Sequence, residues 1–255
     1  MRLASLGSGS SGNATLLDTG EGLILIDCGL SARETERRMQ YLDLSLADIQ
    51  AILVTHEHAD HIGGVSAVAS KSGAQVFATQ GTARKLRCDY QAIRAEQDFL
   101  IPGMSVNIMP VAVPHDAREP VQFTFKLAEI KVGVLTDLGS VTPHVVEEFA
   151  GCESLLVESN HCKEMLSLGP YPAALKRRIL GPWGHLSNDQ TAYFLEQIFS
   201  RSSVPSSLII GHISKENNSK DRVEDCLGDL VSDVDSLVFA SQDEVLPWTK
   251  SAQAA

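Results

Sequence analysis

A histidine-rich segment directly after an apolar run constrains this chain more than any other feature. Residues 51–55 are apolar and long enough for one buried strand, and His56, His58, Asp60 and His61 follow within the next six residues. In extended backbone, side chains two residues apart lie on the same side, so His56 and His58 face one way. Asp60 and His61 can join them from a following helical turn. Imidazoles and carboxylates crowded in this way suit a divalent Zn, Mn or Fe ion; a surface loop rich in His and Asp is the alternative.

Length and cysteine content indicate one intracellular domain. The 255 residues can bury a large core, and a single α/β domain over residues 1–255 is a sufficient interpretation. The five cysteines are scattered without a Cys-x-x-Cys pair, which favours free thiols in a reducing compartment. The N-terminal residues lack the apolar block of a signal peptide, and no run is long enough to span a membrane. We therefore expect a cytoplasmic protein without a membrane partner, whose oligomeric state the sequence leaves open.

The net charge of −11 argues against a broad basic surface for nucleic acid, because 21 Lys and Arg face 32 Asp and Glu. Bound divalent cations would cancel part of the local negative charge, and some acidic residues would be their ligands. Any contact with nucleic acid must therefore be local. Lys215 and the run Lys176-Arg177-Arg178 are cationic candidates for it.

Hydrophobic patterns predict strands and helices in alternation. Strands are expected over 2–6, 14–18, 22–27, 51–55, 74–79, around 99, 104–113, 121–127, 130–136, 154–157, 207–210 and 236–240. Helices are expected over 31–41 and 187–200, with Ser31 and Ser187 as their N-caps, and also from 45 and over 65–72, 82–88, 143–150 and 220–231. Residues 163–180 are expected to be helical or turn-rich. The Gly- and Ser-rich residues 7–13 predict either an anion-binding nest of backbone amides or a tight hairpin. The Ala-rich end is expected to be frayed.

The His-x-His-x-Asp-His segment at residues 56–61 resembles the signature of the metallo-β-lactamase superfamily. The resemblance implies an αββα sandwich with a two-metal site at the strand ends. It also implies that Asp27, at the end of a predicted strand, supports the metal-binding histidines from behind. Following the superfamily's order, the implied ligands are His56, His58 and His115 for one ion and Asp60, His61 and His212 for the other, with Asp137 as a bridge. Zn and Mn are the expected metals, with Fe as a further option.

Six segments resemble the bacterial WalJ (YycJ) group of this superfamily. They lie at residues 8–13, 27–31, 55–61, 158–161, 184–188 and 211–218. Members are regarded as metal-dependent nucleases with exonuclease action on DNA, so the resemblance implies DNA as the partner, with RNA as an alternative. The stretch between His115 and Asp137 is too short for the long tRNA-gripping arm of the related tRNA 3′-processing nucleases.

Those tRNA-processing relatives use a glutamate–histidine pair to protonate the leaving oxygen, and the resemblance carries this pair over to Glu158 and His185. An alkoxide leaving group needs a proton, and imidazole titrates near neutrality, so His185 is the expected general acid and Glu158 its orienting partner. Asp60 is expected to serve the reaction as well as the metals. Substrate contacts are expected from four further side chains, although a structural role for the turn at 215–218 is equally open. These four are Asn160, His161, Lys215 and Asn217.

Other functions remain compatible with the same residues. A phosphodiesterase acting on cyclic or nucleotide small molecules would suit the acidic charge. A thioester or lactone hydrolase shares the metal signature but has less use for a general acid such as His185. A partner protein of a signalling pathway without enzymatic activity is the third alternative.

Overall fold

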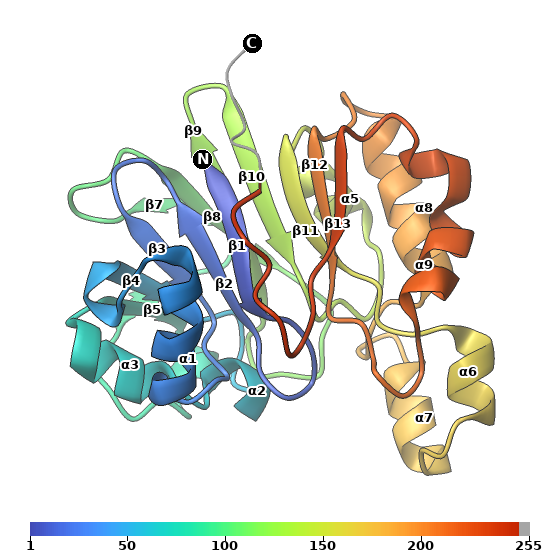
Figure 1. Ribbon diagram of the computed structural model, residues 1–255, viewed down its shortest axis with the longest axis horizontal. Coiled ribbons are helices and arrows are strands. Elements are labelled where there is room, and N and C mark those ends of the chain that lie inside the picture. Colours follow the sequence, from blue (N-terminus) through green and yellow to red (C-terminus); the bar gives the residue numbers. More distant parts are fainter. Residues whose placement is uncertain (250–255) are drawn as a thin grey trace.

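Two β-sheets packed face to face form the centre of the protein, and helices cover their outer faces (Figure 1). The computed structural model describes residues 1–249, so the Ala-rich end, for which fraying is expected, lies outside the described residues. The first sheet has the strand order β1-β2-β3-β4-β5-β6, and the second has the order β13-β12-β11-β10-β9-β8-β7. The expected αββα sandwich is confirmed.

The strands follow the chain through one sheet and then the other. The first sheet contains β1 (Arg2–Gly7), β2 (Ala14–Asp18), β3 (Leu23–Ile26), β4 (Ile49–Leu53), β5 (Gln75–Thr79) and β6 (Gln91–Ile93). The second contains β7 (Phe99–Leu100), β8 (Asn107–Ala112), β9 (Val121–Leu127), β10 (Ile130–Leu135), β11 (Ser154–Glu158), β12 (Ser207–Gly211) and β13 (Ser236–Phe239).

The helices connect these strands. They are α1 (Ala32–Met39), α2 (Ala59–Ile62), α3 (Val65–Ser72), α4 (Gln80–Ala83), α5 (Pro143–Phe149), α6 (Lys163–Leu168), α7 (Ala173–Ile179), α8 (Asn188–Phe199) and α9 (Lys220–Leu227), with short 3₁₀ turns at Gln40–Leu42, Leu46–Asp48 and Gly228–Val231. No helix within residues 1–249 combines the length and the apolar character that crossing a membrane requires.

Successive side chains of the central strands point to opposite faces of the sheet, and this alternation explains the layered packing. In β4, Ala51 and Leu53 belong to the core between the two sheets, whereas Ile52 and the following Val54 pack on the opposite side. That opposite side is covered by α1 and α3, whose buried residues join the same cluster. Because both faces of the strand are buried, its sequence is a continuous apolar run.

Parallel pairing places the functional segments along one edge. Strands β3, β4 and β5 are parallel, and so are β10, β11 and β12. The carboxyl ends of parallel strands meet at the same edge of a sheet, so the segments that follow β3, β4, β10, β11 and β12 lie near one another.

Two predicted elements differ from the structure, and one strand was not predicted. Instead of a helix over 82–88, α4 begins at Gln80 and ends at Ala83, because the Thr79 side chain caps it by accepting from the Thr82 amide. The strand predicted over 104–113 is the shorter β8 (Asn107–Ala112), and β6 (Gln91–Ile93) was not predicted. The predicted N-caps Ser31 and Ser187 are confirmed, since each side chain accepts from an amide in the first helical turn.

Candidate active site

A cavity of about 370 Å³ lies where the strand ends of the two sheets meet. Its floor carries predicted ligands and the predicted general acid, and one wall comes from α7. The lining residues are Ser10, His58, Ala59, Asp60, Asp137, Asn160, Tyr171, Leu175, Arg178, Ile179, His185, His212 and Ser214.

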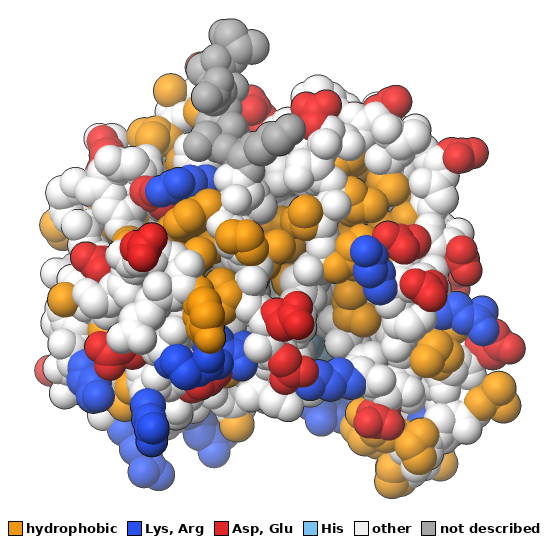
Figure 2. Space-filling view, viewed as in Figure 1, with side chains coloured by type: hydrophobic (Ala, Val, Ile, Leu, Met, Phe, Trp, Pro, Cys, Tyr) orange, Lys and Arg blue, Asp and Glu red, His pale blue; other side chains and the backbone are white. Residues whose placement is uncertain are grey.

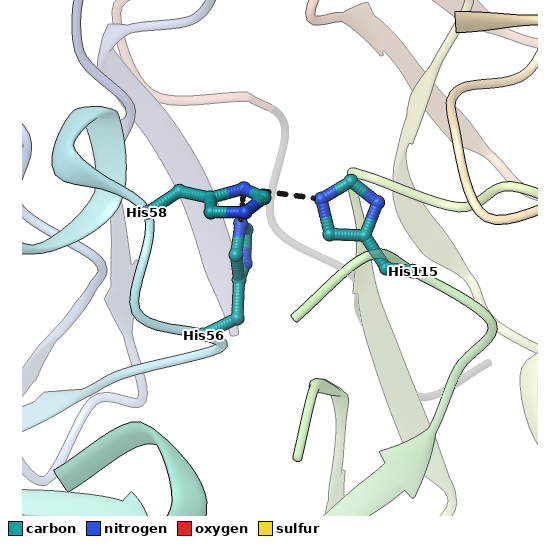
Figure 3. Close-up of side chains that lie close together, drawn as sticks. All are labelled: His56, His58 and His115. Carbon is teal, nitrogen blue, oxygen red and sulfur yellow. Dashed lines mark hydrogen bonds between the residues drawn. The ribbon is translucent and has the colours of Figure 1, made fainter. Parts of the chain in front are cut away.

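Three histidines form the first cluster. His56 and His58 follow β4, and His115 reaches across from the segment after β8 (Figure 3). His56 Nε2 lies 3.0 Å from His58 Nδ1, which lies 3.3 Å from His115 Nε2. Burial lowers the pKa of His56 well below its ordinary value and also lowers the pKa of His115. His56 and His115 are therefore held neutral, which is the form that binds a metal ion.

Asp137 is the centre of a second cluster. It is buried two residues after the end of β10, with Oδ2 3.0 Å from His61 Nε2 and Oδ1 3.3 Å from His212 Nδ1. His185 Nδ1 lies 3.4 Å from the same Oδ1. Burial by itself raises the pKa of Asp137, but the neighbouring His212 and His61 outweigh it and hold that pKa well below its ordinary value. Asp137 is therefore an anion between two sets of imidazoles.

Asp27 supports this cluster from behind. It is buried after β3 and accepts hydrogen bonds from the Thr55 amide (2.8 Å) and hydroxyl (2.7 Å), while Asp27 Oδ2 lies 2.8 Å from His61 Nδ1. Burial lowers the pKa of His61, but Asp137 and Asp27 outweigh it and raise that pKa well above the ordinary value. The carboxylate orients the ring so that Nε2 faces Asp137, which is the arrangement that the resemblance implies.

Three site residues have positive φ angles, a left-handed backbone conformation that favours glycine. Asp27, Asp137 and His212 have φ angles of 56°, 53° and 51°, and each lies one or two residues after a strand end. Such residues cost about 1–3 kcal/mol each and persist only where the surrounding structure holds them. Strain at three strand ends that meet at one cavity marks this edge of the sheets as the functional one.

Glu158 links the second cluster to His185. Its buried carboxylate accepts from the amides of Leu138 (2.7 Å) and Leu186 (3.0 Å), and Oε2 lies 3.2 Å from both His185 Nδ1 and His212 Nδ1. Burial raises the pKa of Glu158, but these hydrogen bonds outweigh it and lower that pKa to about 2. Burial lowers the pKa of His185, and Glu158 more than reverses this, raising it to about 9. His185 is thus a charged donor facing the cavity.

The donor atoms fit divalent metal ions. His56, His58 and His115 each offer one atom within 4.8 Å of the others, and the same holds for two groups that share Asp137. Nε2 of the buried His212 has no hydrogen-bond partner among the described residues, as expected for a nitrogen that binds a metal cation. The groups around Asp137 are His56, His61 and Asp137, and Asp137, Glu158, His185 and His212. Asp60 is not in these groups, but its Oδ2 lies 3.5 Å from His61 Nε2.

Only one of the four expected substrate contacts lines the cavity. Asn160 does so, while its side-chain amide donates to the His212 carbonyl (3.0 Å). His161 and Asn217 are buried outside the lining, and Lys215 pairs with Asp243 on the surface. The sequence set the order of these residues along the chain, but it did not predict the direction in which each side chain points.

The glycine-rich loop is a hairpin in which five amides donate hydrogen bonds within the protein. The amides of Ser8, Gly9, Ser11, Gly12 and Asn13 all donate within the protein. Their acceptors include the side chains of Asn13 and Gln242. Of the two interpretations of residues 7–13, the structure favours the hairpin over the anion nest.

The apolar wall of the cavity was absent from the sequence-based candidates. Tyr171, Leu175 and Ile179 line it together with Arg178, whereas Arg177 does not. Leu175, Arg178 and Ile179 are three and one residues apart, which puts them on one face of α7, and Tyr171 lies just before that helix. This spacing is a signal that the sequence contained.

Fold and site together define a protein of the metallo-β-lactamase fold, in which divalent metal binding is expected of this cavity. The sequence matches the beta-lactamase superfamily domain over residues 23–213, and the chain belongs to that superfamily. The metallo-β-lactamase fold protein YhfI from Bacillus subtilis superposes with a TM-score of 0.71 at 12% identity, covering 96% of this chain and 98% of that one.

Within the superfamily, the chain belongs to the YycJ/WalJ group. It is 33% identical to exodeoxyribonuclease YycJ of Bacillus anthracis over 87% of this chain and 85% of that protein. It is 32% identical to exodeoxyribonuclease WalJ of Streptococcus pneumoniae over 85% of this chain and 82% of that protein.

Proposed function

We propose that this protein is a divalent-metal-dependent exonuclease that hydrolyses phosphodiester bonds at the ends of DNA strands. The YycJ and WalJ relatives bear the name exodeoxyribonuclease and match most of this chain. The seven predicted ligands approach one another at the strand ends, which supports a two-metal site with Zn or Mn. We further propose one hydrolase domain in a reducing compartment such as the cytoplasm, since all five cysteines are free thiols.

The observation that carries this proposal is the contact between Glu158 and His185 beside Asp137. A DNA strand is a poor leaving group, because the departing oxygen needs a proton. With Glu158 3.2 Å from Nδ1 and a pKa raised to about 9, His185 is protonated at neutral pH and lines the cavity. It can therefore donate a proton to the departing oxygen, while Glu158 keeps the ring oriented and stabilises its charge.

The proposed ligands are His56, His58 and His115 for one ion and Asp60, His61 and His212 for the other, with Asp137 between them. Bound there, divalent ions would supply Lewis-acid stabilisation of the phosphate charge. Asp27 and Glu158 orient the rings of His61 and His185, and the hydrophobic cores around the strand ends hold these carboxylates away from water.

End-labelled DNA provides the direct test. Metal-loaded protein should shorten linear single- or double-stranded DNA progressively and leave covalently closed circular DNA intact. His58→Ala, which removes one nitrogen of the first cluster, should abolish this activity. Since the site offers few cations, affinity for DNA should fall gently with salt, with a slope corresponding to about two to four phosphates.

Intact DNA and RNA after incubation with metal-loaded protein would contradict the proposal. If the same preparation hydrolysed cyclic nucleotides or other small diesters efficiently, a small-molecule phosphodiesterase would replace it. Hydrolysis of thioesters or lactones alone would instead indicate a thioester or lactone hydrolase.

A further inference from the structure

Helix α7 has no buried residue, although it lies beside the candidate active site. Helices in globular proteins normally pack one face into the core. Here Leu175, Arg178 and Ile179 of α7 line the cavity instead, together with Tyr171 just before the helix. A helix that contributes its apolar face to a substrate cavity, and not to the core, is built to contact a ligand.

Exposed hydrophobic side chains continue this face beyond the cavity. Leu168, Leu180 and Trp183 are 81%, 51% and 58% exposed. Figure 2 shows hydrophobic side chains gathered at lower right, over α6 and α7. Large exposed apolar groups beside a site favour a ligand with flat apolar surfaces, and nucleobases offer such surfaces to aromatic side chains.

Arg178 supplies the positive charge of this wall. It is the only Lys or Arg among the described residues that line the cavity. Its Nε and Nη2 donate to the two carboxylate oxygens of Asp116, and Asp116 Oδ1 lies 3.5 Å from His115 Nε2. A guanidinium has five N–H donors, so those not used by Asp116 can contact a phosphate next to the first histidine cluster.

The size of the cavity limits what can enter. At about 370 Å³ it is near the lower end of small-molecule sites, which range from about 300 to 1,000 Å³. One nucleotide suits this volume better than a base pair. The strand end must therefore be unpaired where it meets the histidine clusters.

We propose that Tyr171 and α7 bind one unpaired terminal nucleotide of the substrate strand, with its base against Tyr171 and Leu175 and its phosphate against Arg178. The proposal rests on the proposed nuclease function and adds the form of the substrate. It requires a DNA end that frays or carries an overhang, and it assigns recognition of the nucleotide to a segment outside the histidine clusters.

Small chromogenic diesters isolate the base contact. The 3′ and 5′ p-nitrophenyl phosphate esters of thymidine share a leaving group with methyl p-nitrophenyl phosphate, but only they carry a nucleoside. The ratio of kcat/KM for the preferred thymidine ester to that for the methyl ester measures nucleoside recognition. Stacking of one base gives about a tenfold effect, so Tyr171→Ala should lower this ratio about tenfold. Arg177→Gln, on the same helix but outside the cavity, should leave the ratio as it is.

DNA binding isolates the phosphate contact. We would measure fluorescence anisotropy of a labelled phosphorothioate duplex with a one-nucleotide overhang and of the same duplex with blunt ends. The overhang should bind more tightly. Arg178→Gln should raise the Kd of the overhang several-fold and reduce the salt slope by about one, whereas Arg177→Gln removes the same charge and should change neither.

The outcomes separate this inference from the nuclease function. An unchanged ratio in Tyr171→Ala for both thymidine esters, or equal effects of Arg178→Gln and Arg177→Gln on DNA affinity, would overturn the inference while the nuclease activity stood. If wild-type protein left DNA intact but kept the Tyr171-dependent preference for a nucleoside ester, the exonuclease proposal would fail and the nucleotide-binding wall would stand.

Discussion

The two histidine clusters at the strand ends differ in the charge that surrounds them. In the first, His56 and His115 lie among other imidazoles, and burial lowers the pKa of each. In the second, desolvation lowers the pKa of His61 and His185, but Asp137 and Glu158 outweigh it and raise the pKa of each. Burial is common to both clusters, so the placement of carboxylates decides the protonation state. In the first cluster His56 and His115 offer neutral nitrogens, whereas the second cluster stabilises positive charge, either as protons or as metal ions.

The largest expected effect comes from removing Asp137, the proposed bridge between the two metal ions. Asp137→Ala should disturb both ions, because Asp137 belongs to two of the candidate metal groups. Loss of several kcal/mol of charge stabilisation should lower the rate more than about 10⁴-fold. Elemental analysis and phosphodiester hydrolysis measure both consequences. An Asp137→Ala protein that still holds two tightly bound ions would contradict the role of Asp137 as a ligand of both ions.

Removal of His185 should separate acid catalysis from metal binding. His185→Ala should keep its metal ions and lose about 10²–10⁴-fold in rate on DNA, whose leaving group needs a proton. The loss should be much smaller on a p-nitrophenyl diester, whose leaving group departs without protonation. Equal losses on both substrates would remove His185 from the role of general acid.

A smaller effect is expected from changing Asp27, whose carboxylate supports the ring of His61 in the second cluster. Asp27→Asn weakens the orientation of His61 and should lower the affinity of one ion about 10–100-fold, while the ion at His56, His58 and His115 stays bound. Titration against a competing chelator would resolve the two affinities. If both ions weakened to the same extent, Asp27 would act on the whole strand edge and not on His61.

The smallest effect concerns His161, which lies three residues after Glu158 but, unlike His185, makes no hydrogen bond to it. Burial lowers the pKa of His161 to about 4, against an ordinary value of 6.5. Between these values the unfolded chain binds one more proton at this position, so the stabilisation present above pH 6.5 is lost as the pH falls towards 4.

His161→Phe removes the titrating nitrogens and retains a flat ring. Urea unfolding of the variant and the wild type at several pH values should therefore show a shallower loss of stability for the variant between pH 6.5 and 4. Parallel curves for the two proteins would mean that His161 takes no part in the pH dependence.

The sequence by itself determined the order of elements and the ends of the central strands. An apolar run such as residues 51–55 must be buried on both faces, and polar residues directly after it must lie at the edge of the sheet. For that reason the positions of His56, His58, Asp137 and His212 at strand ends could be predicted. The N-caps Ser31 and Ser187 depend only on neighbouring amides, so they could also be predicted from the sequence.

Only the tertiary structure decided which way the remaining side chains face. Lys215 meets Asp243 and Arg178 meets Asp116, 28 and 62 residues away along the chain. Likewise, the Ser11 amide of the glycine-rich loop donates to Gln242, 231 residues away. Local patterns set where a strand or helix begins and ends, because they act over a few residues. Contacts between distant segments depend on sheet order and packing, which no short stretch of sequence contains.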